Sequence, residues 1–412
     1  MDASAKVVGP RLLHSSQWGV IDPVDTPDGG NVGLHKHLSI AAYITRGCTA
    51  KNIMKWLHEN KRIRFTLLEK ISPRSASEQT KMFVNGQWIG CVSSPGETQK
   101  LIKEYRRSGL IPLYTSVSWD IANDVICIYT DSGRLCRPVF YVNDKRNPSY
   151  DREPIVERIM KGTFTWKQLV GGFAEKKSEM KNHNNFTSCE CVNLADLYDA
   201  TTISDLQETQ SVIEYIDTSE TECSLIAMNA NRVKNKNYTH VEIHPSLMFG
   251  VMGNQVVFPE NNQLPRDLFA CGQMRQAVSL YHSNYQTRID KMGVVLNNGQ
   301  TPLVKSRYLQ KINKEEHPYG ENVIVAIMCY GGYNVEDSIL FNEGSVKRGL
   351  FRTTYYNSYE DREESSKVGQ SQVDSRFGKV DGDNVVGLKP GFDYGELEDN
   401  GLIRENTPLD DK

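Results

Sequence analysis

The chain has 412 residues, of which 39% are hydrophobic and 24% are charged, a composition typical of a soluble globular protein rather than a disordered or membrane one. That length allows two or three domains with real cores. No run of about 18 apolar residues predicts a transmembrane helix. The first residues lack the apolar segment of a signal peptide. The nine cysteines are scattered, with Cys189 and Cys191 the closest pair, so we expect reduced thiols in an intracellular protein and no zinc site.

The net charge of −3 conceals an uneven distribution along the chain. Residues 232–311 carry 10 Lys and Arg against 4 Asp and Glu, whereas residues 360–412 carry 7 against 14. A basic middle is compatible with a polyanion-binding surface there, although charge runs are more often solvated faces.

The first clear elements are β-strands. Residues 81–92 predict a hairpin, because Asn85-Gly86 can take the positive φ angles of a type I′ turn between short β-prone arms. Residues 125–142 predict strand, turn and strand. We therefore expect a compact α+β module over residues 48–145, followed by a loop-rich linker.

A helix is predicted directly after the hairpin, and both its ends can be identified. Ser94 is the expected N-cap, Pro95 takes the first helical position and Glu97 completes a capping box. Gly109 is expected to end the helix.

Pro265 opens a second predicted helix, over roughly residues 266–285. Four residues recur at helical spacing and predict one buried stripe: Ala270, Met274, Ala277 and Tyr281.

Three polar residues of this helix lie off the stripe, and they are candidates for phosphate or nucleic-acid contacts. Arg266 falls in the first turn, where backbone N–H groups and the helix dipole favour anions. A guanidinium binds phosphate with two hydrogen bonds and is never deprotonated. Arg275 and Gln276, almost three turns along, could contact a backbone and a sugar or base. The alternative is an ordinary solvated helix face.

Residues 323–330 form a continuous apolar run that predicts a strand buried on both faces. Gly331 and Gly332 follow, where the absence of Cβ atoms permits a turn and the close approach of another chain. Two adjacent carboxylates, Glu336 and Asp337, come next.

These carboxylates are candidate Mg²⁺ ligands. Mg²⁺ takes one or two carboxylates together with waters and substrate phosphates. Neighbouring side chains of an extended segment point to opposite sides, so we expect at most one of the pair to face a given ligand. The alternative is that Glu336 or Asp337 caps the turn or pairs with Arg348.

Residues 11–40 are dense in Asp, Pro and Gly, which predicts a rigid, tightly turned loop. Asp25 and Asp28 are compatible with simple Asx turns. His35 and His37 alternate along a strand-like stretch, but they are too few for a metal site, and a surface histidine pair is the simpler interpretation.

Together these segments resemble one family, the second-largest subunit of multisubunit DNA-dependent RNA polymerases, the counterpart of the bacterial β subunit. The resemblance runs in collinear order through nearly the whole chain, with residues 150–212 the poorest match. It is of the eukaryotic, archaeal or large-DNA-virus type. The stretches that carry it are RLLHSSQWGVIDPVDTPDGGNVGLHKHLSI (11–40), VNGQWIG, TDSGRLCRP, EYIDTSETECSLIAM, EIHPSLMFG (242–250), FPENNQLPR (258–266), RQA (275–277), AIMCYGGYNVEDSILFNEGSVKRGLFRT (326–353) and GELEDNGLI.

The resemblance implies part of the catalytic core of an RNA polymerase, with templated RNA synthesis from NTPs by two-metal nucleotidyl transfer. Asp337, with Glu336 beside it, would help to hold the second, nucleotide-delivered Mg²⁺. Arg266 would contact the triphosphate of the incoming NTP. Arg275 and Gln276 would lie along the RNA near its 3′ end.

Further implied contacts involve the basic middle and the first loop. Lys and Arg of residues 232–311, among them Arg288 and Lys305, would line the RNA–DNA hybrid through its backbone. Asp25 falls where the family has a carboxylate near the active centre. The chain departs from the family in having Asp25 and Asp28 for two glutamates, and Asp267 for an amide beside the predicted phosphate contact.

The implied fold class is α+β, mixed and β-rich, with several domains. The expected order is a fork region (1–47), an external α+β module (48–145), a linker with a second external or fork portion (146–225), a hybrid-binding domain with part of a double-psi β-barrel (226–355) and the start of the wall (356–412).

The implied partners are the largest subunit, which would hold the primary metal, other polymerase subunits, the DNA template, the RNA–DNA hybrid and NTPs, with no membrane. The family's protrusion, lobe and zinc-binding clamp are not in these residues, so we expect a fragment or split-gene product that does not polymerise alone. The expected location is the nucleus, or host cytoplasm or virion for a viral member. The alternatives are a non-catalytic nucleic-acid-binding or assembly fragment and, less favoured, a free Mg²⁺ phosphoesterase.

Overall fold

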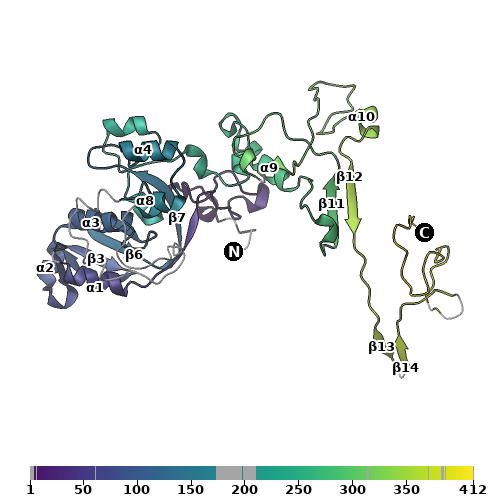
Figure 1. Cartoon of the computed structure of the whole chain (residues 1–412), viewed down its shortest axis with the longest axis horizontal. Coiled ribbons are helices and arrows are strands. Elements are labelled where there is room, and N and C mark those ends of the chain that lie inside the picture. The colour runs from purple at the N-terminus through teal and green to yellow at the C-terminus, as the bar shows by residue number, and fades with distance from the viewer. Residues whose placement is uncertain are drawn as a thin grey trace. The chain divides into compact units, whose positions relative to one another are not determined.

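A computed structural model describes residues 4–5, 7–60, 62–172, 197, 210–312, 315–369, 371–381, 385 and 387–411 (Figure 1). The chain divides into a first unit, Met1–Ala277 with Pro302–Glu316, and a second unit, Val278–Thr301 with His317–Lys412. Four sheets and several helices occur in the described residues, which confirms a mixed α+β fold. The boundaries of the five predicted domains stay predictions. None of the described helices combines the length and apolar character needed to cross a bilayer.

The first sheet of the first unit has five strands in the order β2-β4-β3-β6-β5. Neighbouring strands are antiparallel except β3 and β6, which run parallel. The predicted hairpin is confirmed as β3 and β4, with φ angles of 49° at Asn85 and 80° at Gly86 between them. The strands are β2 (Phe65–Leu67), β3 (Thr80–Val84), β4 (Gln87–Val92), β5 (Ser116–Asp120) and β6 (Val125–Tyr129).

Helices α1 (Lys51–Glu59) and α3 (Pro95–Arg107) pack on this sheet, and the short α2 (Pro73–Glu78) precedes β3. The core contains Ile53, Trp56 and Leu57 from α1 and Leu101, Ile102 and Tyr105 from α3, against Met82, Val117, Ile126 and Ile128 of the strands.

Helix α3 begins at Pro95 and ends before Gly109, as predicted, but the predicted capping box is wrong. The side chain of Ser94 accepts no capping hydrogen bond, and its buried Oγ has no partner. The physical reason is the backbone of Ser94: its ψ of 78° lies below the values at N-caps that do bond here, such as 152° at Ser72 and 116° at Asn342.

The second sheet is organised around β7 (Ser132–Tyr141), the second strand predicted within residues 125–142. Antiparallel to β7 lie β1 (Tyr43–Arg46), β8 (Ile213–Asp217) and β10 (His240–Val241), and β10 pairs in parallel with β9 (Ile226–Ala227). The helices beside it are α4 (Glu153–Met160), α5 (Trp166–Gly171) and α8 (Thr218–Glu222).

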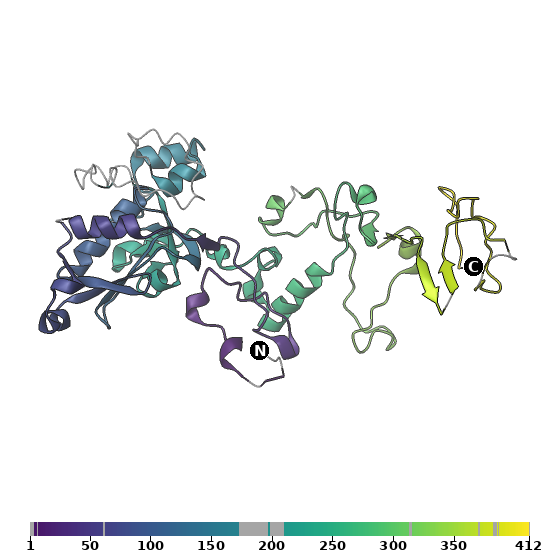
Figure 2. The same cartoon turned by 90° about the horizontal axis from the view of Figure 1, so that it is seen from below.

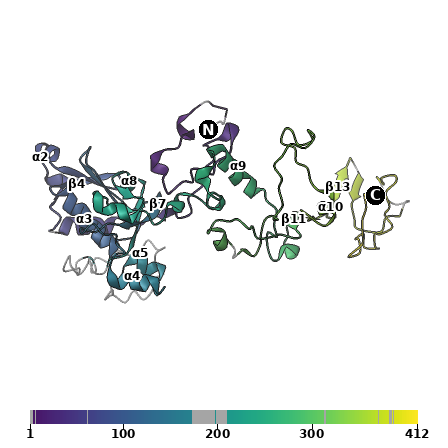
Figure 3. The same ribbon diagram turned by 90° about the horizontal axis from the view of Figure 1, so that it is seen from above.

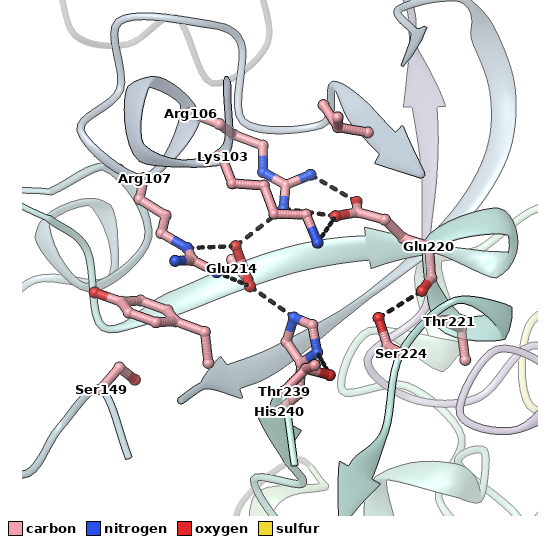
Figure 4. Close-up of polar contacts among 12 residues, drawn as sticks. Lys103, Arg106, Arg107, Ser149, Glu214, Glu220, Thr221, Ser224, Thr239 and His240 are labelled. Atoms are coloured by element: carbon pink, nitrogen blue, oxygen red, sulfur yellow. Dashed lines mark hydrogen bonds and ion pairs between the residues drawn. The ribbon is translucent and has the colours of Figure 1, made fainter. Parts of the chain in front are cut away.

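A buried cluster of charged side chains joins α3 to β8, α8 and β10 (Figure 4). Arg106 binds both carboxylate oxygens of Glu220, at 2.6 and 3.0 Å, and also Glu214 at 2.9 Å. Arg107 binds Glu214 through two bonds of 2.9 Å, and His240 Nε2 lies 2.7 Å from the same carboxylate. We call these residues the charge cluster. Because every carboxylate meets at least one guanidinium, the cluster offsets much of the cost of burying its charges.

The second predicted helix is α9 (Leu264–Arg275), and it is shorter than predicted. It ends at Arg275, so Ala277 and Tyr281 lie beyond it and the predicted stripe is wrong. Its buried face is instead Asp267, Leu268 and Cys271. The loops of residues 7–42 lie alongside α9, as the two turned views show (Figures 2 and 3).

The second unit has two small antiparallel sheets, β11 (Met292–Leu296) with β12 (Thr353–Asn357) and β13 (Ser365–Val368) with β14 (Ser371–Asp374), and the short α10 (Glu343–Lys347). The buried strand predicted over residues 323–330 is wrong, since this run has no strand partner among the described residues. Ile324 and Ile327 are 104% and 97% exposed. An extended segment without a hydrogen-bonded neighbour is not a strand, and the double-psi barrel stays a prediction.

Among the described residues, these cysteines carry free thiols: Cys91, Cys127, Cys136, Cys223, Cys271 and Cys329. Cys189 and Cys191 lie outside the described residues.

Candidate nucleic-acid and metal-binding site

The structure brings two predicted site residues together at the end of α9. Asp25 is only 3% exposed and accepts a 2.6 Å hydrogen bond from Nη2 of Arg275. His37 completes the group, with its Nε2 3.0 Å from Nη1 of Arg275 and 3.8 Å from Oδ1 of Asp25. Since a guanidinium can only donate, Nε2 of His37 is the acceptor. We call these three residues the Asp25 cluster, and it gives His37 a role that the sequence did not predict.

A second aspartate fixes the loop that carries Asp25. Asp22 accepts backbone hydrogen bonds from Val24 at 3.0 Å and from Gly250 at 2.6 Å, and burial raises the pKa of its carboxyl. A Cβ on Gly253 would lie 2.7 Å from the Asp22 carboxylate. Glycine is therefore required here by close approach, and the loop is tied to the segment that precedes α9.

Three separate sequence motifs meet at Glu242. Its carboxylate accepts bonds of 2.7 and 2.8 Å from Nη1 of Arg137 and one of 3.1 Å from the indole of Trp18. Arg137 and Glu242 are both nearly buried, and a Cβ on Gly19 would lie 2.5 Å from the Arg137 side chain. The first loop, β7 and the segment after β10 are thus held in one arrangement. None of these three residues was predicted as a site residue, because a single motif does not show its partner.

The first turn of α9 presents Arg266 to solvent. Its guanidinium carbon lies 5.4 Å from the ring centroid of Phe269, and its side chain is exposed. The neighbouring Asp267 is 4% exposed and accepts a 3.1 Å hydrogen bond from the Asn262 amide. Its carboxylate therefore has a polar partner inside the unit, but a neutral amide leaves its negative charge in place beside a phosphate at Arg266. Gln276 is the exposed C-cap of the helix.

The two predicted hybrid contacts are already paired with carboxylates. Arg288 binds Asp290 through bonds of 2.7 and 3.3 Å, in the second unit. Lys305 binds Glu315 at 2.6 and 2.8 Å, in the first unit. A phosphate would have to compete with these carboxylates, and the role of both cations stays a prediction.

The turn after residues 323–330 is closed by its own side chains. Asn334 accepts from the backbone N–H of Tyr330 at 3.0 Å and donates to the carbonyl of Met328 at 2.6 Å. Gly331 and Gly332 have φ angles of 59° and 78°, so the predicted need for glycine is met.

Glu336 and Asp337 are both exposed, and both have left-handed backbones, with φ angles of 54° and 65°. The assumption of an extended segment with its side chains on opposite sides was therefore wrong. The Arg348 guanidinium donates to Ser345 Oγ at 3.3 Å, and in the part of the chain described it pairs with neither carboxylate.

The donor chemistry of this pair fits Mg²⁺ but cannot complete a site. The described residues contain no group of three or more His, Cys, Asp or Glu positioned to hold a metal. Two exposed carboxylates that pair with no cation among the described residues match an ion that keeps waters and phosphate oxygens as its other ligands. Asp337 lies in the second unit and Arg266 in the first, so their convergence on one ligand stays a prediction.

Comparison with known proteins decides the family. Models for RNA polymerase Rpb2 domains 3, 4, 5 and 6 match residues 1–44, 82–143, 204–245 and 252–412, in that order. DNA-directed RNA polymerase II subunit 2 of Arabidopsis thaliana is 34% identical over 98% of this chain. The chain belongs to the family of second-largest RNA polymerase subunits.

Relatives in this family come from eukaryotes and archaea. Subunit RPB2 of Encephalitozoon cuniculi is 33% identical over 99% of this chain, and subunit Rpo2 of Sulfolobus acidocaldarius is 31% identical over 95%. The chain spans about a third of the length of these relatives, between 31% and 32%. The Asp25 cluster and the Glu242 contacts thus belong to segments that match polymerase-subunit domains 3, 4 and 5 or the stretch of domain 6 around α9.

Proposed function

We propose that this chain forms part of the catalytic core of a DNA-dependent RNA polymerase and acts only together with other subunits, the largest subunit among them. The observation that carries the proposal is the ordered match of four consecutive domains of the second subunit. DNA, the RNA–DNA hybrid and NTPs would be its ligands, and a eukaryotic-type member would act in the nucleus.

Asp337, with Glu336 beside it, would hold a Mg²⁺ ion delivered with the nucleotide. When bound, that ion would neutralise charge on the triphosphate as nucleotidyl transfer proceeds. The hydrogen bonds of Asn334 hold the turn that carries Glu336 and Asp337, so both carboxylates sit on a defined backbone.

Arg266 would bind the NTP triphosphate from the first turn of α9, where the helix N-terminus also favours an anion. Arg275 would approach the RNA with its guanidinium oriented by Asp25 and His37. A buried carboxylate bound to one edge of the guanidinium restricts its rotamers, which lowers the entropy lost on binding a phosphate.

The test is templated, Mg²⁺-dependent NTP incorporation by the complex assembled with its partner subunits. Asp337→Ala should abolish elongation without preventing assembly. Arg266→Ala should raise the NTP concentration at half-maximal rate by about 10- to 150-fold, because a charge-assisted contact of roughly 1.5–3 kcal/mol is lost. Glu343→Ala and Lys347→Ala, an exposed pair on α10, serve as controls and should leave both values unchanged.

The competing function is a non-catalytic nucleic-acid-binding or assembly fragment. Under that alternative the Asp337→Ala complex elongates at the unaltered rate, and only variants that prevent assembly reduce RNA synthesis. Unchanged elongation in a correctly assembled Asp337→Ala complex therefore rules out the proposed metal role.

A further inference from the structure

Two loops at one end of the second sheet lie against each other in the first unit. The loop of residues 143–147 follows β7, and the loop of residues 229–237 precedes β10. The backbone N–H of Val142 donates to the carbonyl of Thr239 at 2.9 Å, and Nη2 of Arg146 donates to Oδ1 of Asn237 at 2.9 Å. Strand pairing between β7 and β10 keeps the loops adjacent.

Together the loops expose five cations, which we call the two-loop basic surface: Lys145, Arg146, Arg232, Lys234 and Lys236. None of the five takes part in the ion pairs found among the described residues, whereas surface cations such as Lys161, Arg288 and Lys347 do pair. The sequence contains no Asp or Glu between Glu222 and Glu242.

The single carboxylate in the shorter loop is already neutralised. Asp144 forms an ion pair of 2.6 Å with Lys100 of α3. The local field of the two-loop basic surface is therefore positive even though the whole chain has a net charge of −3.

The loops are held in place by packing and by their own polar groups. Val233 is 1% exposed and packs with Ala227 and Val241. This packing anchors the longer loop to the core between Arg232 and Lys234. In the shorter loop, Asn143 Oδ1 accepts from the N–H of Asn147 at 2.9 Å, and their backbones are bonded at 2.9 Å. The backbone positions that carry the cations are therefore fixed before an anion binds.

Arg146 also offers a way to test the surface. It has a φ of 60°, a left-handed conformation that glycine takes without strain and that costs other residues roughly 1–2 kcal/mol. An arginine at such a position loses stability that glycine would keep, so Arg146→Gly can remove the charge without straining the fold.

We propose that the two-loop basic surface binds the phosphate backbone of a nucleic acid, in addition to the contacts proposed for α9. The cations are Lys and Arg at a solvent-facing loop, with no exposed aromatic ring in either loop for stacking on bases. Binding is therefore sequence-indifferent and salt-dependent, because phosphate contacts release counterions. Arg232, Lys234 and Lys236 lie in the basic middle that the family resemblance assigns to the RNA–DNA hybrid. The proposal therefore rests on the proposed function, and it adds the loop of residues 143–147 and the pairing of the two loops into one surface.

The test measures binding of the 412-residue chain to a 20-nucleotide RNA and to a 20-base-pair DNA over a series of salt concentrations. Lys145→Glu/Lys234→Glu should weaken binding and lower the slope of log K against log salt by about two contacts, roughly 0.7–0.9 each. Lys51→Glu/Lys55→Glu, on α1, makes the same change in net charge and should cost much less. The probe that loses more affinity identifies the nucleic acid bound.

Equal losses in the two double variants, or no binding by the unaltered chain, would overturn the proposal. Arg146→Gly provides a variant that folds without the strain: it should keep or raise the melting temperature and still weaken binding. If Arg146→Gly binds both probes as the unaltered chain does, Arg146 is not a contact. A variant of Arg275 tests the α9 proposal separately, because Arg275 is not in either loop.

Discussion

The first unit buries charged and apolar side chains against partners of its own, whereas the second unit leaves an apolar segment exposed to solvent. In the charge cluster, Glu214 accepts from two guanidiniums while lying 3% exposed. All eight residues of the run 323–330 in the second unit are exposed instead. The difference teaches that apolar content alone does not reveal where a segment finds its partners. A hydrogen-bonded neighbour decides whether such a run becomes a strand.

The largest effect is expected from breaking the charge cluster. Glu214→Ala would leave Arg106 and Arg107 buried with less compensation, and the free energy of unfolding of the first unit should fall by about 3–5 kcal/mol. All five tryptophans lie in the first unit, so their fluorescence during denaturant unfolding reports on that unit alone.

Glu343→Ala is the matched control in the second unit, where unfolding is followed by amide hydrogen exchange because that unit contains no tryptophan. Glu343 pairs with Lys347 at 2.6 Å, but their side chains are 80% and 74% exposed, and such pairs contribute about 0–1 kcal/mol. A loss at Glu214 no larger than at Glu343 would show that the cluster is not the stabilising element that its geometry indicates.

Isoleucine-to-alanine substitutions give a smaller contrast with identical chemistry. Ile126 in β6 is fully buried, whereas Ile324 is 104% exposed. Ile126→Ala should lower the free energy of unfolding by about 2–5 kcal/mol, since it loses burial and leaves a cavity. Ile324→Ala should change the free energy of unfolding of the second unit, measured by amide hydrogen exchange, by no more than about 0.5 kcal/mol. A comparable cost at Ile324 would mean that residues 323–330 are buried in the protein in solution.

These contrasts also show what could be predicted from the sequence. The hairpin at Asn85-Gly86 and the start of α3 at Pro95 were correct, because turn and cap preferences act over a few neighbouring residues. The capping box at Ser94 failed because a single backbone angle decides whether its hydroxyl reaches the N–H. The strand over residues 323–330 failed because its partner is a non-local requirement.

The candidate site divides in the same way. Asp25 and Arg275 were each predicted singly, but their ion pair joins positions 250 residues apart, which no local pattern encodes. Glu242, Arg137 and Trp18 were missed for that reason. Glu336 and Asp337 were predicted as a pair because they are adjacent, although their left-handed backbones were not expected.

Acidification should affect the first unit through His240. Burial lowers its pKa below the ordinary 6.5, with Glu214 raising it and Lys103 and Arg107 lowering it further. The unfolded chain then binds a proton that the folded chain does not, so stability is complete above pH 6.5 and falls as the pH drops below it, by at most about 1.4 kcal/mol per pH unit.

The measurement is tryptophan-detected unfolding between pH 7 and 5, compared with His240→Gln. Glu214 and Glu220 have lowered pKa values, so their contribution is lost only at still lower pH, below their ordinary 4.5. The loss of stability between pH 6.5 and 5 therefore precedes any loss from the two glutamates. If His240→Gln shows the same pH dependence over that range as the unaltered chain, another group causes the loss.

The smallest effect concerns helix caps, and here the comparison between the units is reversed. Asn342 accepts a 2.9 Å hydrogen bond from the N–H of Ser345 at the start of α10, whereas Ser94 caps α3 by position only. Asn342→Ala should destabilise α10 by about 1 kcal/mol, measured as faster amide hydrogen exchange over residues 343–347.

Ser94→Ala removes a buried hydroxyl without a partner among the described residues. The free energy of unfolding of the first unit should therefore fall by less than about 0.5 kcal/mol, or rise. A loss near 1 kcal/mol at Ser94 would mean that its hydroxyl does cap α3 in solution, and the sequence-based capping box would then be right after all.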